Sequence, residues 1–167
     1  ICARSGSKGI KDKNIQKIGK FNLLQSTINQ AKKISHIKSI YVSTDSYKYK
    51  LIAEKTGAIV PFLRSKLLSK DSTPEWKVWK NFIDKMGFDD EQIIIVLPTT
   101  SPNRKLSDIN KGVKLFKKNK HDIAHSLEKN TCCTTLFLKR NITECTRELQ
   151  VSGFEKNLRS PAYHELL

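Results

Sequence analysis

The segment A-R-S-G-S-K-G-I-K-D-K-N, residues 3–14, follows two apolar residues, Ile1 and Cys2, as a loop follows the end of a buried strand. Its glycines can adopt tight turns that bring main-chain N–H groups close to an anion. Arg4 can add a forked pair of charge-assisted hydrogen bonds to phosphate oxygens, and Lys13 can add a point charge. We therefore predict a phosphate-binding loop after the first strand of an α/β domain. The segment matches neither a Walker loop nor the dinucleotide motif G-x-G-x-x-G, and the simpler alternative is a solvent-exposed turn.

Strands and helices alternate along the rest of the chain, as judged from the spacing of apolar residues. The pattern predicts helices over residues 21–35, 47–55, 74–86 and 107–118, and strands over residues 39–43, 58–62, 93–97 and 122–127. The unbroken apolar run 93–97 is typical of a central strand that is covered on both faces. This order predicts a three-layer α/β fold, in which a mostly parallel sheet has helices on both faces. Residues 134–138 and 149–154 show weaker patterns and are predicted as strands of an added sheet or arm.

No repeat or low-complexity linker interrupts residues 1–167, so we predict one domain. In sheets of this kind, ligands bind outside the carboxyl ends of the strands. Three polar loops follow predicted strands at such ends, namely Arg4–Asn14, Ser43–Ser46 and Pro98–Arg104. We expect these loops to lie together and to form the binding site.

The chain is strongly basic, with 31 Lys and Arg against 16 Asp and Glu and a formal net charge of +15. A nucleic-acid-binding protein would concentrate this charge on one face. Here the lysines are spread over every predicted helix and arginines are few, so we predict no nucleic-acid partner. The positive field would still attract small anionic substrates.

The cysteines and the hydropathy of the chain argue against a zinc-binding protein and against a membrane protein. The four cysteines form no C-x-x-C pair and have no histidine at zinc spacing, so we predict reduced thiols and no structural metal. No apolar run approaches the length of a membrane span, and no signal peptide is visible. We therefore expect a cytoplasmic protein with no membrane partner.

The motifs resemble those of the acylneuraminate cytidylyltransferases, also called CMP-sialic acid synthetases. The opening loop is similar to their first signature, and V-S-T-D-S at residues 42–46 resembles the segment after their second strand. Further similar segments follow in the family's order, at residues 57–65, 68–74, 99–104 and 157–163. The resemblance covers essentially the whole chain and implies a fold like that of the nucleotide-diphospho-sugar transferases.

The resemblance implies that the anomeric hydroxyl of an acidic nine-carbon sugar attacks the α-phosphorus of CTP, and that Mg²⁺ bridges the phosphate oxygens. It implies catalytic roles for Lys13 and Arg4. The other implied contacts are Ser7, Asn14, Arg64 and Ser72 for the nucleotide, and Ser101, Arg104 and Arg159 for the sugar. The alternatives are a 2-keto-3-deoxy-octonate (KDO) or other sugar nucleotidyltransferase, or a basic nucleotide- or RNA-binding module. For single residues, Asp45 could be a helix cap, Arg64 and Arg104 could form surface ion pairs, and Trp76 and Trp79 could belong to the core.

Two departures from the family pattern bear on the sugar and on turnover. Pro98 and Thr99 stand where Gln and Pro are usual, and residues 130–135 lack the family's proline and its basic or aromatic residue. Legionaminic or pseudaminic acid therefore fits as well as N-acetylneuraminic acid. In the family a dimer-forming arm and an acidic pair that holds Mg²⁺ come later than the last segment matched here. We therefore expect a fragment that binds nucleotide but turns it over poorly, with residues from about 130 beginning an arm that makes the full-length protein a homodimer.

Overall fold

The computed structural model describes residues 1–118, except 8, 36 and 89–91, together with residues 123–126 and 135–138. The predicted strand 149–154 and Arg159 lie outside the described residues. The prediction of one domain over residues 1–167, with an arm from about residue 130, stays a prediction.

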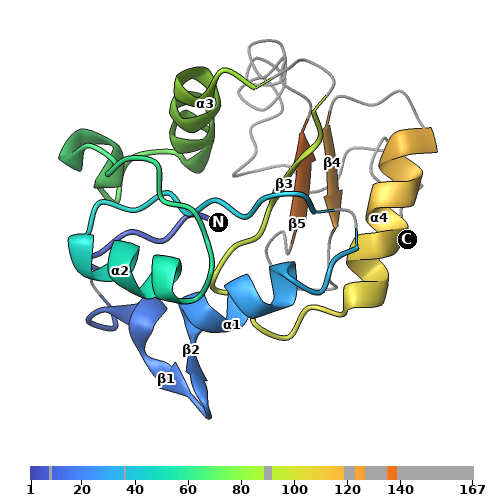
Figure 1. The fold of residues 1–167 in the computed structure, drawn as a ribbon. Coiled ribbons are helices and arrows are strands. Elements are labelled where there is room, and N and C mark those ends of the chain that lie inside the picture. Colours follow the sequence, from blue (N-terminus) through green and yellow to red (C-terminus); the bar gives the residue numbers. More distant parts are fainter. Residues whose placement is uncertain (8, 36, 89–91, 119–122, 127–134, 139–167) are drawn as a thin grey trace.

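Three segments near the start of the chain run parallel to one another (Figure 1). Parallel bridges join Cys2 to Ser43, Tyr41 to Ile59, and Thr44 to Leu63. Main-chain hydrogen bonds of 2.7–3.0 Å connect the same segments, for example from Ala3 N to the Ser43 carbonyl at 3.0 Å and from Arg64 N to the Thr44 carbonyl at 2.7 Å. The predicted strands 39–43 and 58–62 are therefore paired in parallel, although as isolated bridges and not as long regular strands.

A second group of strands forms a three-stranded sheet in the order β3-β5-β4. Its members are β3 (Ile94–Val96), β4 (Ile123–Ser126) and β5 (Thr135–Leu138). β5 pairs antiparallel with both neighbours, with Phe137 opposite Ile95 on one side and Ala124 on the other. β3 and β4 therefore run parallel to each other. Residues 134–138 contain a strand, as predicted, but β5 lies between the two strands predicted before it and so does not belong to an added sheet.

Four α-helices match the predicted ones within a few residues: α1 (Leu23–Ala31), α2 (Tyr47–Lys55), α3 (Glu75–Met86) and α4 (Leu106–Lys118). Two short 3-10 turns, η1 (Lys13–Ile15) and η2 (Lys66–Ser69), lie in the loops. α1 begins later than predicted because Asn22 and Gln25 form a capping box at its start, and it ends earlier, at Ala31. The preceding residues form a hairpin that the sequence analysis missed, β1 (Lys17–Ile18) and β2 (Phe21–Asn22). No helix in the described part of the chain is long and apolar enough to cross a membrane.

Helices cover both faces of the parallel segments. Successive side chains of a strand point to opposite faces, so apolar residues on both faces need a covering layer. Val42 packs with Leu24 of α1 and Tyr49 of α2 in one buried cluster. The neighbouring Tyr41 faces the other way, where its ring centroid lies 5.9 Å from that of Phe82 in α3. Figure 1 shows α1 and α2 on one side of these segments and α3 on the other.

β3 is covered on both faces in the same manner, as predicted for the apolar run 93–97, but it stands at the end of the order β3-β5-β4 and not at its centre. Val96 packs with Ile83 of α3. Leu97 packs on the opposite face with Val113 and Phe116 of α4. Trp79 also packs against the cluster of Ile83 and Val96, so the core interpretation of this tryptophan is confirmed. The three-layer α/β fold is thus present, with β5 as the antiparallel exception.

Gly57 ends α2 in a conformation that favours glycine, with a φ of 85° just after the C-cap residue Thr56. We expect Gly57→Ala to lower the free energy of unfolding by about 1 kcal/mol, because a side chain is strained at positive φ. The added Cβ would also lie 2.8 Å from Lys32 Nζ, but that flexible side chain can move. Urea denaturation measures the change. Gly9→Ala is the matched control, since Gly9 lies outside this φ region with no atom within 4 Å of an added Cβ, and an equal loss there would contradict the explanation.

Candidate functional site

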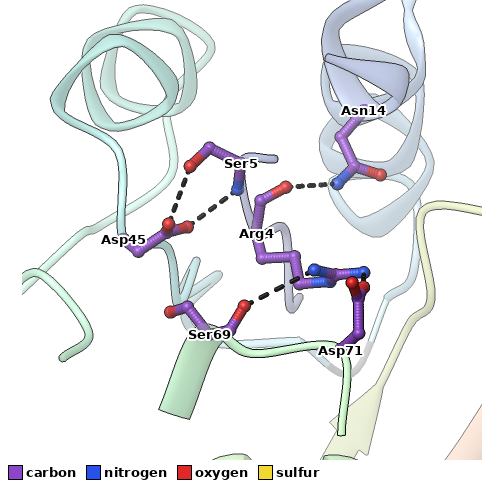
Figure 2. A network of polar contacts seen from close by, with 6 residues as sticks. All are labelled: Arg4, Ser5, Asn14, Asp45, Ser69 and Asp71. Carbon is purple, nitrogen blue, oxygen red and sulfur yellow. Dashed lines mark hydrogen bonds and ion pairs between the residues drawn. The ribbon is translucent and has the colours of Figure 1, made fainter. Parts of the chain in front are cut away.

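The Arg4–Asn14 loop begins at the carboxyl end of the first parallel segment, directly after the fully buried Ala3. Figure 2 shows this loop meeting the segments around Asp45 and Asp71, which lie far away in the sequence. The Pro98–Arg104 loop reaches it as well, through a contact between Thr99 and Asn14. The prediction that the three polar loops lie together is confirmed.

Asp45 holds the start of the loop. One carboxylate oxygen accepts a hydrogen bond from the Ser5 main-chain N–H at 2.8 Å, and the other accepts one from the Ser5 hydroxyl at 2.7 Å. The helix cap is the neighbouring Ser46, whose side chain accepts from Tyr49 N. The interpretation of Asp45 as a simple cap was therefore wrong, because its carboxylate joins two loops that lie 40 residues apart.

Asp12 anchors the far side of the loop to α2. It adopts a left-handed conformation with a φ of 54°, which few residues other than glycine accept. Its carboxylate accepts a hydrogen bond from the Tyr49 hydroxyl at 3.2 Å and lies 3.4 Å from Lys48 Nζ. Burial, followed by the negative charge of Asp12, raises the pKa of Tyr49. The phenol therefore stays protonated and donates.

Two predicted arginines meet at Ser69, in the loop that follows the third parallel segment. Arg4 forms an ion pair with Asp71, and its other guanidinium nitrogen donates to the Ser69 carbonyl at 3.4 Å. Arg64 donates from Nε to the Ser69 hydroxyl at 3.1 Å. Only 7% of Arg64 is exposed, so the alternative of a surface ion pair was wrong for this residue. The network joins the loop of residues 65–73 to the phosphate loop (Figure 2).

Asn14 lies beneath the loop and is 5% exposed. Its Nδ2 donates to the Arg4 carbonyl at 3.0 Å, and its Oδ1 accepts from the Thr99 hydroxyl at 2.7 Å. Both ends of the carboxamide are thus bonded within the protein. The predicted contact between Asn14 and the nucleoside stays a prediction.

Arg104 braces the loop that follows β3. Its guanidinium donates to the Pro98 carbonyl and, at 3.2 Å, to Gln30 Oε1 in α1, while Gln30 Nε2 donates to the Pro102 carbonyl. Burial lowers the pKa of Arg104 to about 10, which leaves the guanidinium charged at neutral pH. The predicted contact of Arg104 with the sugar stays a prediction, and so does that of the half-buried Ser101.

The remaining predicted residues are accessible to a ligand. Lys13 and Ser7 are half-buried and Ser72 is exposed. Within the described part of the chain, the Lys13 ammonium forms no hydrogen bond or ion pair; its main-chain N–H bonds the Ile10 carbonyl at 3.2 Å. Asp12, Ser69 and Asp71 belong to the network although the sequence did not predict them as site residues.

Two cavities lie near the sheet, away from Arg4 and Lys13. The larger, about 430 Å³, is a mostly apolar space between β3, the first two parallel segments and α3. The smaller, about 40 Å³, is lined by Cys2, Glu75, Trp79 and the start of the Pro98–Arg104 loop. Neither is lined by Arg4 or Lys13.

Comparisons with known proteins agree with this arrangement. The family model described as cytidylyltransferase matches residues 1–166. The chain is 37% identical over 128 residues to post-translational flagellin modification protein B of Campylobacter coli, covering 73% of this chain and 53% of that protein. It is 43% identical over 81 residues to the CMP-N,N'-diacetyllegionaminic acid synthase of Campylobacter jejuni, covering 48% of this chain and 34% of that protein.

Two more distant similarities extend this result. The chain is 34% identical over 125 residues to an N-acylneuraminate cytidylyltransferase of Streptococcus agalactiae, covering 74% of this chain and 29% of that protein. The structure of a CMP:2-keto-3-deoxy-manno-octonic acid synthetase complexed with CTP superposes with a TM-score of 0.69 at 11% identity, covering 93% of this chain and 81% of that one. This last likeness confirms the fold class. The chain spans about half, or less, of the length of the three curated relatives. With residues 1–166 matched by the family model and the Arg4–Asn14 loop lying at the strand ends, the chain belongs to the cytidylyltransferase family.

Proposed function

We propose that the chain is the nucleotide-binding portion of an enzyme that transfers CMP from CTP to a nonulosonic acid, an acidic nine-carbon sugar of the sialic-acid type. The observation that carries the proposal is the Arg4–Asn14 loop. It lies at the carboxyl ends of parallel segments and is fixed by Asp45, Asp12 and Asn14, and it presents Arg4 and Lys13. A rigid loop that bears cations is what phosphoryl transfer requires, since this chemistry depends on positioning and charge neutralisation.

In the proposed reaction the anomeric hydroxyl oxygen of the sugar attacks the α-phosphorus of CTP. A new P–O bond forms, the bond from the α-phosphorus to the bridging oxygen breaks, and pyrophosphate leaves with that electron pair. The hydroxyl proton is released to solvent. Lys13 stabilises the charge that develops at the α-phosphate, and Arg4 and Ser7 bind the triphosphate. Asn14, Arg64 and Ser72 add nucleotide contacts, and Ser101, Arg104 and Arg159 lie on the sugar side.

In the proposed reaction, Mg²⁺ enters with the nucleotide. No group of three or more His, Cys, Asp or Glu side chains that could hold a metal ion is found among the described residues. Mg²⁺ typically keeps several waters and binds through substrate phosphates and few carboxylates. We propose that the ion is carried by the phosphate oxygens of CTP.

The identity of the sugar is inferred from the relatives. The relative that is 43% identical is named for diacetyllegionaminic acid, and another is named for N-acylneuraminate, so we propose a nonulosonic acid over KDO. The fold likeness to the octonic acid synthetase, at 11% identity, does not discriminate between sugars. A homodimer and a cytoplasmic location stay predictions for the full-length protein.

We expect the chain to bind CTP more tightly than ATP, GTP or UTP in the presence of Mg²⁺, because the loop signatures are those of a cytidine-specific family. Titration calorimetry with the four nucleotides measures this preference. A random RNA oligonucleotide is the control. Equal binding of all four nucleotides, or RNA affinity that falls steeply with salt, would instead indicate a basic module that binds polyanions.

A further inference from the structure

The hydrogen bond between Thr99 and Asn14 joins two loops across 85 residues of sequence. Both side chains are buried, with 3% of Thr99 and 5% of Asn14 exposed. The Thr99 hydroxyl donates to Asn14 Oδ1 at 2.7 Å, and Asn14 Nδ2 donates to the Arg4 carbonyl at 3.0 Å. The three groups form a continuous chain of hydrogen bonds from the loop after β3 to the main chain of the phosphate loop.

The direction of each hydrogen bond in this chain is fixed by chemistry. The Arg4 carbonyl can only accept, so the Asn14 amide must turn its NH₂ group towards Arg4. The Asn14 oxygen then faces Thr99, and the hydroxyl must donate to it. Removing the hydroxyl leaves a buried amide oxygen without this partner, and burial makes such a loss costly.

The position of Thr99 is itself constrained. Arg104 donates to the carbonyl of Pro98, the residue before Thr99, and also to Gln30 in α1. The hydroxyl is therefore presented from a braced loop.

We propose that Thr99 is a positioning residue for the triphosphate. Its hydroxyl orients the Asn14 amide, which holds the main chain of Arg4 on one side and adjoins Lys13 on the other. Both cations proposed to contact the phosphates are thereby placed before the nucleotide arrives, which lowers the cost of ordering them on binding. The inference rests on the proposed function, because it assumes that CTP binds at this loop.

The test compares Thr99→Val, which keeps the shape and removes the hydroxyl, with Thr99→Ser, which keeps the hydroxyl. Calorimetry of the chain with CTP and Mg²⁺ is expected to show a dissociation constant about tenfold higher for Thr99→Val. Thr99→Ser is expected to stay within about twofold of the wild type. In a double-mutant cycle, Thr99→Val should add little to the loss caused by Asn14→Ala, since the two residues act through one chain of hydrogen bonds.

Thr27→Val is the matched control for a purely structural effect. Thr27 is fully buried in α1, and its hydroxyl donates to the Leu23 carbonyl at 2.9 Å. Its loss should alter the free energy of unfolding without changing the affinity of the folded protein for CTP. Equal CTP affinity in Thr99→Val and the wild type would overturn the inference and leave the proposed function intact.

Two further outcomes, a wild-type chain without a preference for CTP and a Thr99 variant that does not fold, also bear on the positioning role of Thr99. A wild-type chain that shows no preference for CTP would overturn the proposed function and this inference with it. If Thr99→Val does not fold, Thr99→Ala provides a second variant without the hydroxyl. If neither folds while Thr99→Ser does, the hydroxyl serves the fold alone and the positioning role is wrong.

Discussion

Replacing Lys13 with alanine in the intact protein is expected to slow pyrophosphate release from CTP by about 10²–10³-fold, the typical cost of losing one donor that stabilises a transition state. Lys13 is half-buried, and among the described residues no carboxylate neutralises its ammonium group. The negative charge that develops during phosphoryl transfer should therefore interact directly with the Lys13 ammonium. Because this interaction strengthens in the transition state, turnover should fall much more than CTP affinity.

Two measurements separate these effects for Lys13. A steady-state assay of pyrophosphate release gives the rate with N-acetylneuraminic, legionaminic or pseudaminic acid as acceptor, and calorimetry gives the CTP affinity. Lys11→Ala is the control, since Lys11 is an exposed cation of the same loop. Near-normal turnover in Lys13→Ala, or an equal loss in Lys11→Ala, would show that Lys13 acts only as a surface charge.

Replacing Asp45 with alanine is expected to lower the free energy of unfolding by about 3 kcal/mol, since hydrogen bonds to a charged group contribute about 1.5–3 kcal/mol each. The carboxylate accepts two such bonds from Ser5, at 2.8 and 2.7 Å, and it is only half-buried. It also lies just before α2, where a negative charge is favourable. The affinity for CTP should fall as well, because Asp45 holds Ser5, and Ser5 is next to Arg4, which is proposed to bind the triphosphate.

Urea denaturation followed by circular dichroism measures the effect at Asp45. Asp45→Asn retains one acceptor oxygen and should recover about half of the lost free energy. Asp84→Ala is the control, because Asp84 forms an exposed ion pair with Lys80 at 2.7 Å within α3, and such pairs contribute about 0–1 kcal/mol. A loss at Asp45 no larger than at Asp84 would mean that the two bonds to Ser5 do not stabilise the loop.

The local elements were predictable because their signals lie within a few residues of one another. α2 has the predicted bounds, set by the N-cap Ser46 and by Gly57 after its end. The apolar run 93–97 contains a strand that is covered on both faces. The place of the Arg4–Asn14 loop after a strand could be predicted for the same reason, since its glycines and cations are contiguous in the sequence, whereas its binding of phosphate stays a prediction.

The missed features depend on contacts between distant residues. The four residues of β5, T-L-F-L, are equally suited to an edge strand, an arm or the interior of a sheet, because periodicity does not specify a neighbour. The bonds from Asp45 to Ser5 and from Thr99 to Asn14 cross 40 and 85 residues. Nothing in the sequence around these four residues indicates which of them are hydrogen-bonded to each other. The hairpin of β1 and β2 had a weak signal in Gly19, which lies at its two-residue turn.

The place of β5 in the sheet sets the order in which the domain can be assembled during synthesis. β3 and β4 are separated by β5 and so cannot pair directly with each other. Until residue 138 has emerged from the ribosome, both strands keep an unpaired edge that can recruit another chain. The parallel segments at the start of the chain need no residue after Leu63 for their bridges and can form early. β3 and β4 therefore stay open to pairing with another chain after the bridges of the parallel segments are able to form.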